Sequence, residues 1–397
     1  MKKFLALMVS AVLLTGLLSG CQSNSADKQE GAGDSPSSGD TIKVGLNYEL
    51  SGDVATYGQS LVAGIELGLE EINSEGGVLG KQIEAIKADN KSEDTEAANV
   101  SARLVTRDHV LALLGPATSG NTKAATPAAM QNKVPLISGS ATSDDVTVDS
   151  NGNVRDYIFK TCYNDSFQGV MMAELASRDL GAKTAAILGD STSDYAKGLS
   201  TNFKNTFLEG GGKLVAEEAY QAKDTDFKAV LTSLKGQNPD VLFVPGYYEE
   251  VGLIIRQARE LGLNMPILGA DGFESPKLVE IAGKEALNNV FYSSHYSPLD
   301  DTAEVNKFKA SFEAKYGHEP DAFNALGYDM AYFLKDGFER AGEANSEKLR
   351  DALAETKNFK GVTGVLSVDE KHNPVKSVTI IEVKNGETTF YKKLDPK

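Results

Sequence analysis

The stretch Val110-Leu-Ala-Leu-Leu114, followed at once by Gly115-Pro-Ala-Thr-Ser119, decides the fold of this chain. The same pattern returns at Val134-Pro-Leu-Ile-Ser138, which runs into Gly139-Ser-Ala-Thr142. Each stretch is a short apolar strand followed by a loop of small, partly hydroxyl-bearing residues. In open α/β sheets, ligands bind just beyond the carboxyl ends of the strands, where helix N-termini attract anions. The two loops therefore predict a carboxylate-binding site, with Ser119, Ser140 and Thr142 as hydroxyl donors.

Outward from this stretch, strand-like and helix-like segments alternate along the chain. The first helical pattern has apolar residues at Leu61, Ile65, Leu69 and Ile72, at spacings of four, four and three. We predict strands at residues 42–47, 83–88, 110–114, 134–138, 157–161, 184–188, 214–220, 241–245, 266–269 and 290–294. We predict further helices at residues 95–107, 166–180, 196–208 and 227–236, and one that ends at Leu261.

This alternation implies parallel sheets with right-handed crossovers. Two βα series of similar length follow one another, and residues 301–342 are mostly helical with a break at Pro320-Asp321. We predict an α/β fold of two Rossmann-like lobes, joined by a multi-strand hinge, with a ligand cleft between them. The predicted lobe 1 is 41–161 plus 296–375, and lobe 2 is 162–295 plus 376–397.

Length and charge limit the classes of function. A chain of 397 residues suggests two domains, each able to bury a core. The formal net charge is −16 and the pI is near 4.8, so the basic footprint of a nucleic-acid-binding protein is missing. We therefore expect no nucleic-acid partner.

The N-terminus has the pattern of a secretory signal. Lys2-Lys3 precede the apolar residues 4–18, which are too few for a typical transmembrane helix, and small residues lead to Cys21. The placement of Cys21 resembles the bacterial lipobox, which implies cleavage before it and a lipid on its sulfur. The alternative is an ordinary signal with a chance cysteine. Residues 1–20 are thus a predicted lipoprotein signal peptide, and 21–40 a lipidated cysteine with a disordered tether.

No arrangement for covalent or metal chemistry is apparent. The other cysteine, Cys162, has no recognisable histidine partner, so we expect a buried structural thiol. Ser119 lacks a nucleophile-elbow motif, and the loop around it lacks the Gly-Lys-Ser/Thr ending of a phosphate loop. We expect a protein that is not an enzyme and has no catalytic residues, no metal and no cofactor.

From about Thr41 to its end, the chain resembles the branched-chain amino-acid (leucine/isoleucine/valine) substrate-binding proteins of ABC transporters, which have the type I periplasmic-binding fold. The matching segments, in chain order, are Leu50-Ser-Gly-Asp-Val-Ala-Thr-Tyr-Gly58, Glu71-Ile-Asn-Ser-Glu-Gly-Gly77, Gly115-Pro-Ala-Thr-Ser119, Pro135-Leu-Ile-Ser-Gly-Ser-Ala-Thr142, Phe167-Gln-Gly169, Ser193-Asp-Tyr-Ala-Lys-Gly198 and Pro245-Gly-Tyr-Tyr248. Each is weak alone, but together, in this order and spacing, they are specific.

The resemblance implies a monomeric, extracytoplasmic lipoprotein, anchored to the outer face of a Gram-positive-type cell membrane. Such a protein closes on a free aliphatic amino acid and delivers it to the permease and ATPase subunits of an ABC importer. Carried over by position, Ser119, Ser140 and Thr142 hold the ligand carboxylate.

On the same resemblance, Tyr195 and Asp271 hold the ligand ammonium, and Tyr57, Tyr247 and Phe323 line the side-chain pocket. Asp271 replaces what is often a glutamate. The physics agrees, since a zwitterion leaves water only if donors meet its negative pole and an acid its positive pole. The predicted loops that carry these residues contain no Lys or Arg to pair with an acidic side chain of the ligand, which argues against glutamate or aspartate as the main ligand.

Several alternatives remain open at the level of sequence. The hydroxyl residues could be helix caps, Asp271 a turn residue, and the aromatic residues plain core packing. The same fold could bind another small amino acid or amide, such as alanine, threonine or an aromatic amino acid. It could also serve as a sensory receptor.

Overall fold

The first sheet contains five parallel strands, as the apolar runs predict. A computed structural model describes residues 41–297, 299 and 301–394. The strand order is β2-β1-β3-β4-β5, with β1 (Thr41–Tyr48), β2 (Gln82–Asp89), β3 (Ala112–Leu114), β4 (Leu136–Ser138) and β5 (Ile158–Lys160). Helices α1 (Ala55–Ser74), α2 (Asp94–Thr106) and α3 (Ser119–Asn132) connect them. Strands β3, β4 and β5 are buried throughout, as expected of a parallel sheet covered on both faces.

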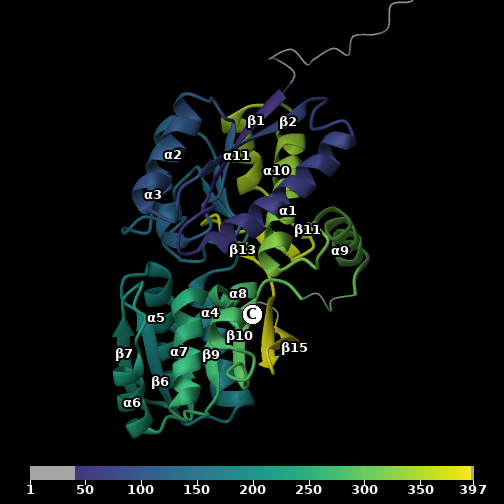
Figure 1. Ribbon diagram of the computed structural model, residues 1–397. Helices are drawn as coiled ribbons and strands as arrows, with labels where there is room; N and C mark the ends of the chain where they lie inside the picture. The colour runs from purple at the N-terminus through teal and green to yellow at the C-terminus, as the bar shows by residue number, and fades with distance from the viewer. Residues whose placement is uncertain (1–40, 298, 300, 395–397) are drawn as a thin grey trace, which may run out of the picture. The chain divides into compact units, whose positions relative to one another are not determined.

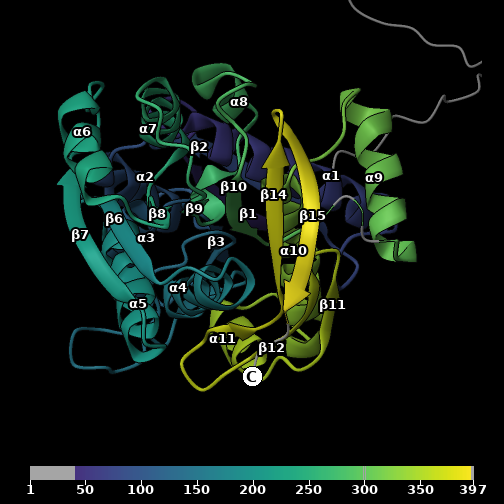
Figure 2. The ribbon, with the colours of Figure 1, turned by 90° about the horizontal axis from the view of Figure 1, so that it is seen from below.

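The second sheet repeats this order and adds two strands. Its order is β15-β14-β10-β9-β8-β6-β7, with β6 (Thr184–Asp190), β7 (Lys213–Tyr220), β8 (Val241–Phe243), β9 (Ile267–Gly269), β10 (Val290–Ser294), β14 (Val378–Lys384) and β15 (Glu387–Leu394). The last two are antiparallel to their neighbours and lie side by side in Figure 2. The helical elements of this lobe are α4 (Asp165–Glu174), the π-turn η1 (Leu175–Asp179), α5 (Asp194–Glu209), α6 (Lys228–Gln237), α7 (Tyr248–Glu260), the 3₁₀ turn η2 (Asp271–Phe273) and α8 (Pro276–Ala282).

The late part of the chain returns to the first lobe before it completes the second. Helices α9 (Ala303–Tyr316), α10 (Ala322–Ala341) and α11 (Ser346–Ala354) are followed by a small sheet of β11 (Phe359–Gly361), β12 (Gly364–Val368) and β13 (Pro374–Val375). Figure 1 shows α10 and α11, in yellow-green, among the purple and blue elements of the first lobe. The chain therefore passes between the lobes after β5, after β10 and between β13 and β14.

Helices α1 and α10 approach so closely that glycine is required at their contact. A Cβ on Gly64 would lie 2.0 Å from the carbonyl oxygen of Asn324, and one on Gly327 would lie 2.1 Å from that of Leu61. The apolar face of α1 that the sequence predicts, from Leu61 to Ile72, is buried beside this contact. Close backbone packing thus fixes α10 on the first lobe.

The two-lobe α/β prediction is confirmed, and the differences concern the bounds of some elements and the presence of two short helices. The predicted strand at 110–114 begins only at Ala112, and the one at 241–245 ends at Phe243. The predicted helix at 166–180 is α-helical only to Glu174 and continues as the π-turn. Sequence analysis omitted α8 and α11. The predicted signal peptide and tether lie outside the described residues, and no helix of the described part is long and apolar enough to span a membrane.

Candidate functional site

A small cavity lies where loops from both lobes meet. The space between its atoms is about 240 Å³, part of it open to solvent, and it is lined by Tyr57, Ala117, Thr118, Ser119, Ser140, Tyr195, Tyr247, Asp271, Gly272 and Phe323. These residues follow the carboxyl ends of β3, β4, β6, β8 and β9, or lie at the starts of α1 and α10. This is the edge at which open α/β sheets bind ligands.

The loop between β3 and α3 is held in place by a buried carboxylate that sequence analysis missed. Glu49, just after β1, accepts hydrogen bonds from the N–H groups of Ala117 (2.9 Å) and Thr118 (3.1 Å). It also accepts from the side chains of Thr118 (3.0 Å) and Asn121 (2.8 Å). Thr118 is the N-cap of α3, so Glu49 fixes the first turn of that helix against the cavity. Its place directly after a buried strand was the signal that could have revealed it.

The three residues predicted for the ligand carboxylate differ in their surroundings. Ser119 lines the cavity, and its hydroxyl accepts the N–H of Ser143 at 3.1 Å, which leaves its own proton free to donate. Ser140 also lines the cavity, but its hydroxyl donates to the Ala117 carbonyl at 2.8 Å. Thr142 is fully buried beside the Asp165 carboxyl and is not among the lining residues.

Asp271 is the carboxylate that lines the cavity. Its Oδ1 accepts the Tyr195 hydroxyl at 2.8 Å, and its Oδ2 lies 3.0 Å from Nε2 of His295. The Tyr195 oxygen in turn accepts the Gly272 N–H at 2.8 Å. No Lys or Arg lies among the lining residues. The cavity can therefore place a cation against Asp271, facing the α3 N-terminus.

Aromatic rings form the wall of the cavity between Asp271 and the N-terminus of α3. Tyr57 stacks on Phe323 with centroids 4.5 Å apart, and Tyr195 stacks on Tyr247 at 5.1 Å. Tyr57 meets Tyr247 edge-on at 5.8 Å. Rings packed in this way offer an apolar surface to a ligand side chain. Tyr248 lies outside the lining set, and its hydroxyl donates to the Asp53 carbonyl at 3.0 Å.

Direct contacts hold the lobes together around the cavity. The Tyr57 hydroxyl, from the first lobe, donates to the Gly272 carbonyl at 2.5 Å. Lys123 on α3 pairs with Asp145 of its own lobe at 2.5 Å and with Asp194 of the other at 2.6 Å. On the other lobe, Lys223 lies 3.1 Å from Asp53. The structure is therefore a closed arrangement of the two lobes.

A second, larger hollow is lined in part by residues that follow Asp271 in the chain. It holds about 1740 Å³, much of it open to solvent, and its lining includes Phe273, Glu274, Tyr292 and Asp321. The predicted ligand residues other than Thr142 line the smaller cavity and not this hollow, so the smaller cavity is the candidate ligand site.

Glu274, at the rim of this hollow, should make stability depend on pH. Burial raises its pKa from 4.5 to about 7, and the neighbouring Asp321 adds repulsion. A raised carboxyl pKa means that the folded protein holds a proton more tightly than the unfolded chain, so the free energy of unfolding falls as pH rises from about 4.5 through 7. Because the residue keeps some exposure, we expect Glu274→Gln to stabilise the protein by about 1–2 kcal/mol at pH 8.

The measurement is urea denaturation of both proteins at pH 5 and pH 8. The gain should shrink toward pH 5, where the parent is itself protonated. Glu280→Gln, which changes an exposed glutamate on α8, is the matched control. An equal effect of Glu274→Gln at both pH values would contradict the expectation.

Cys162 does not line the cavity. Cys162 is buried, and burial raises the pKa of its thiol to about 12, so it stays protonated at neutral pH. This fits the structural role expected from sequence. Within the described ranges, no cluster of three or more His, Cys, Asp and Glu side chains is placed to hold a metal ion.

Comparison with known proteins gives relatives over most of the chain. A family model described as periplasmic binding protein matches residues 41–388. The leucine-, isoleucine-, valine-, threonine- and alanine-binding protein of Pseudomonas aeruginosa is 32% identical over 336 residues, which cover 84% of this chain and 87% of that protein.

Solved structures agree in fold. A branched-chain amino acid transporter substrate binding protein of Streptococcus pneumoniae, in complex with isoleucine, is 42% identical with a TM-score of 0.85 and covers 90% of this chain and 100% of its own. A leucine binding protein of Thermotoga maritima is 37% identical with a TM-score of 0.85 and covers 89% and 99%. With its two lobes, its cleft and these relatives, the chain belongs to the periplasmic binding protein family.

Proposed function

We propose that this protein captures leucine, isoleucine or valine outside the cytoplasm and delivers it to the permease of an ABC importer. The observation that carries the proposal is a cavity between the two lobes in which a helix N-terminus faces Asp271 across aromatic walls. The names of its Pseudomonas, Streptococcus and Thermotoga relatives support a branched-chain ligand. Their family is one of solute-binding proteins, and we propose no reaction on the ligand.

Each pole of the amino acid has a proposed partner in the cavity. Ser119 and the first turn of α3 hold the carboxylate, with Ser140 contributing through its main chain, since its hydroxyl is engaged by Ala117. Tyr195 and Asp271 hold the ammonium. The rings of Tyr57, Tyr247 and Phe323 then contact the aliphatic side chain. We also propose Thr142 as a donor to the carboxylate, although it is fully buried and does not line the cavity.

The proposal extends to the rest of the chain. We propose a monomer, anchored through a lipid on Cys21 at the outer face of the cell membrane. We also propose lobe boundaries at 41–161 plus 296–375 and 162–295 plus 376–397. Strand pairing supports the boundary between residues 375 and 376, because β13 pairs with β12 while β14 and β15 extend the second sheet.

Calorimetric titration with free amino acids tests the function. We expect leucine, isoleucine and valine to bind in the micromolar range or tighter, and glutamate and lysine not to bind, because the cavity has no partner for a second charge. Absence of heat, and of a thermal shift, with every aliphatic amino acid would contradict the proposal.

A second ligand class has one specific observation in its favour. The Pseudomonas relative is named for threonine and alanine as well. Both amino acids present the same two poles. A competition series of alanine, threonine and phenylalanine against leucine separates this alternative from a branched-chain preference.

A further inference from the structure

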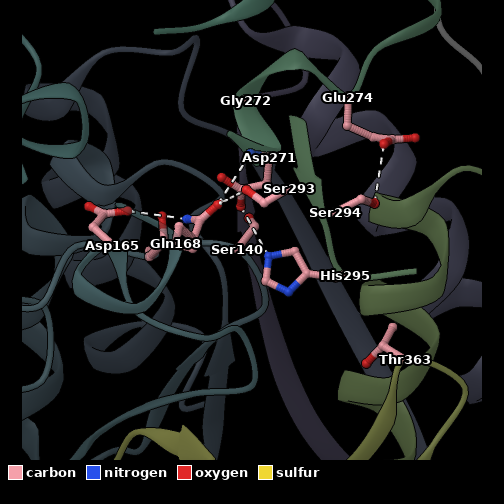
Figure 3. A network of polar contacts seen from close by, with 12 residues as sticks. Ser140, Asp165, Gln168, Asp271, Gly272, Glu274, Ser293, Ser294, His295 and Thr363 are labelled. Carbon is pink, nitrogen blue, oxygen red and sulfur yellow. Dashed lines mark hydrogen bonds and ion pairs between the residues drawn. The ribbon is translucent and has the colours of Figure 1, made fainter. Parts of the chain in front are cut away.

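His295 lies against the acid of the proposed site. It follows β10, in one of the segments that pass between the lobes, and its Nε2 is 3.0 Å from Oδ2 of Asp271. The side chain is 1% exposed. Its ring stacks on Tyr163, which lies in the segment after β5, with centroids 3.7 Å apart. Two interlobe segments thus meet behind Asp271, and Figure 3 shows the imidazole beside the carboxylate.

The environment of His295 fixes its protonation. Burial lowers its pKa to about 4, against the opposing effect of the Asp271 hydrogen bond, so the ring is neutral at pH 7. A neutral imidazole next to a carboxylate oxygen must place its single proton on the nearer nitrogen, here Nε2. Nδ1 is then left as an acceptor, and it is buried with no hydrogen-bond partner among the described residues.

Asp271 has two further partners, Tyr195 and Gln168. Tyr195 donates to its other oxygen at 2.8 Å, and its own N–H donates to Oε1 of Gln168 at 3.3 Å. The same Gln168 oxygen accepts the Ser293 hydroxyl at 2.7 Å. Each carboxylate oxygen therefore has one fixed donor and spare lone pairs. Asp165 and Lys376 are charged groups near enough to influence this cluster, and Glu274 influences Tyr163, whose ring stacks on His295.

We propose that His295 is a positioning residue, which donates from Nε2 to Asp271 and holds that carboxylate aimed at the ligand ammonium. The proposal rests on the proposed function, in which Asp271 receives that ammonium. A neutral donor suits this task because it stabilises the anion without cancelling the charge that the ligand needs. The hydrogen bond also links the ammonium subsite directly to the interlobe segments.

Two substitutions separate positioning from mere packing. His295→Leu fills the space without a donor, and His295→Gln keeps an amide N–H near the position of Nε2. We expect His295→Leu to weaken leucine binding about ten- to hundredfold at pH 7.5, the effect of losing a hydrogen bond to a charged group. His295→Gln should stay within about threefold of the parent. Equal losses in both variants, or none in His295→Leu, would overturn the proposal. A parent that binds no amino acid would instead overturn the proposed function.

Nuclear magnetic resonance of the unaltered protein gives a test that needs no variant. The chain has only four histidines, His109, His295, His318 and His372, so their ring nitrogens can be assigned individually. We expect His295 to be the neutral Nε2–H tautomer from pH 5.5 to pH 8. A proton on Nδ1, or an imidazolium within this range, would overturn the proposal.

Discussion

Replacing Asp271 with asparagine should reduce the affinity for leucine by at least about thirtyfold, and by up to a few thousandfold. Loss of one member of a buried, hydrogen-bonded charge pair costs about 2–5 kcal/mol, and each 1.4 kcal/mol is a factor of ten. Asp271 is the acid that lines the cavity, so the ligand ammonium would be desolvated with no opposite charge. Isothermal titration of the parent and the variant at pH 7.5 measures the difference.

The control for this experiment is Asp226→Asn, which changes an exposed aspartate outside the cavity lining. Asparagine preserves the acceptor that Asp226 offers to the N–H of Lys228. This variant should bind leucine as the parent does. Parent-like binding by Asp271→Asn would show that the ammonium lies elsewhere.

Replacing Gly64 with alanine should destabilise the first lobe by about 3 kcal/mol or more. The new methyl would lie 2.0 Å from the Asn324 carbonyl oxygen and 2.8 Å from the Tyr328 nitrogen. Both are backbone atoms of α10 and cannot rotate away, so the helices must separate and lose packing, and overpacked sites usually cost 1–3 kcal/mol even where side chains can adjust. The midpoint of urea denaturation reports the loss.

Gly236 on α6 provides the matched control, since a Cβ there would have no atom within 4 Å. Alanine is favoured over glycine inside a helix by about 1 kcal/mol, so Gly236→Ala should leave the protein equally stable or slightly more so. A Gly64→Ala variant that denatures with the parent would mean that α1 and α10 can part without cost.

The sequence predicts the lobes well because parallel strands buried on both faces leave a clear apolar pattern. Val44 and Leu46 on β1, like Leu113 and Leu114 on β3, are fully buried in runs that need no alignment to find. Strand ends are less certain. The run from Val110 is apolar throughout, yet only its last three residues pair as a strand, because hydrophobicity marks burial and not ladder hydrogen bonds.

The site is predictable only in part, for a physical reason. Ser119, Asp271 and the aromatic residues follow strand ends or match the family's segments, and the structure brings them to one cavity. Glu49 and His295 contact Ala117 and Asp271 from 68 and 24 positions away. The place of Glu49 after a buried strand marks it as a candidate, but local sequence does not show what either residue contacts. Gly64 and Gly327 likewise look like poor helix residues until the two helices are seen in contact.

The matching strand orders of the two sheets have a consequence for selectivity. Each lobe contributes the loops that follow equivalent strands, yet the first lobe offers donors and the second an acid. A molecule with only one of the two charges, such as a fatty acid or an alkylamine of similar size, would therefore engage a single lobe. We expect such a molecule to bind one lobe without drawing the other lobe onto it. It would then compete with the amino acid for the cavity without itself being transported.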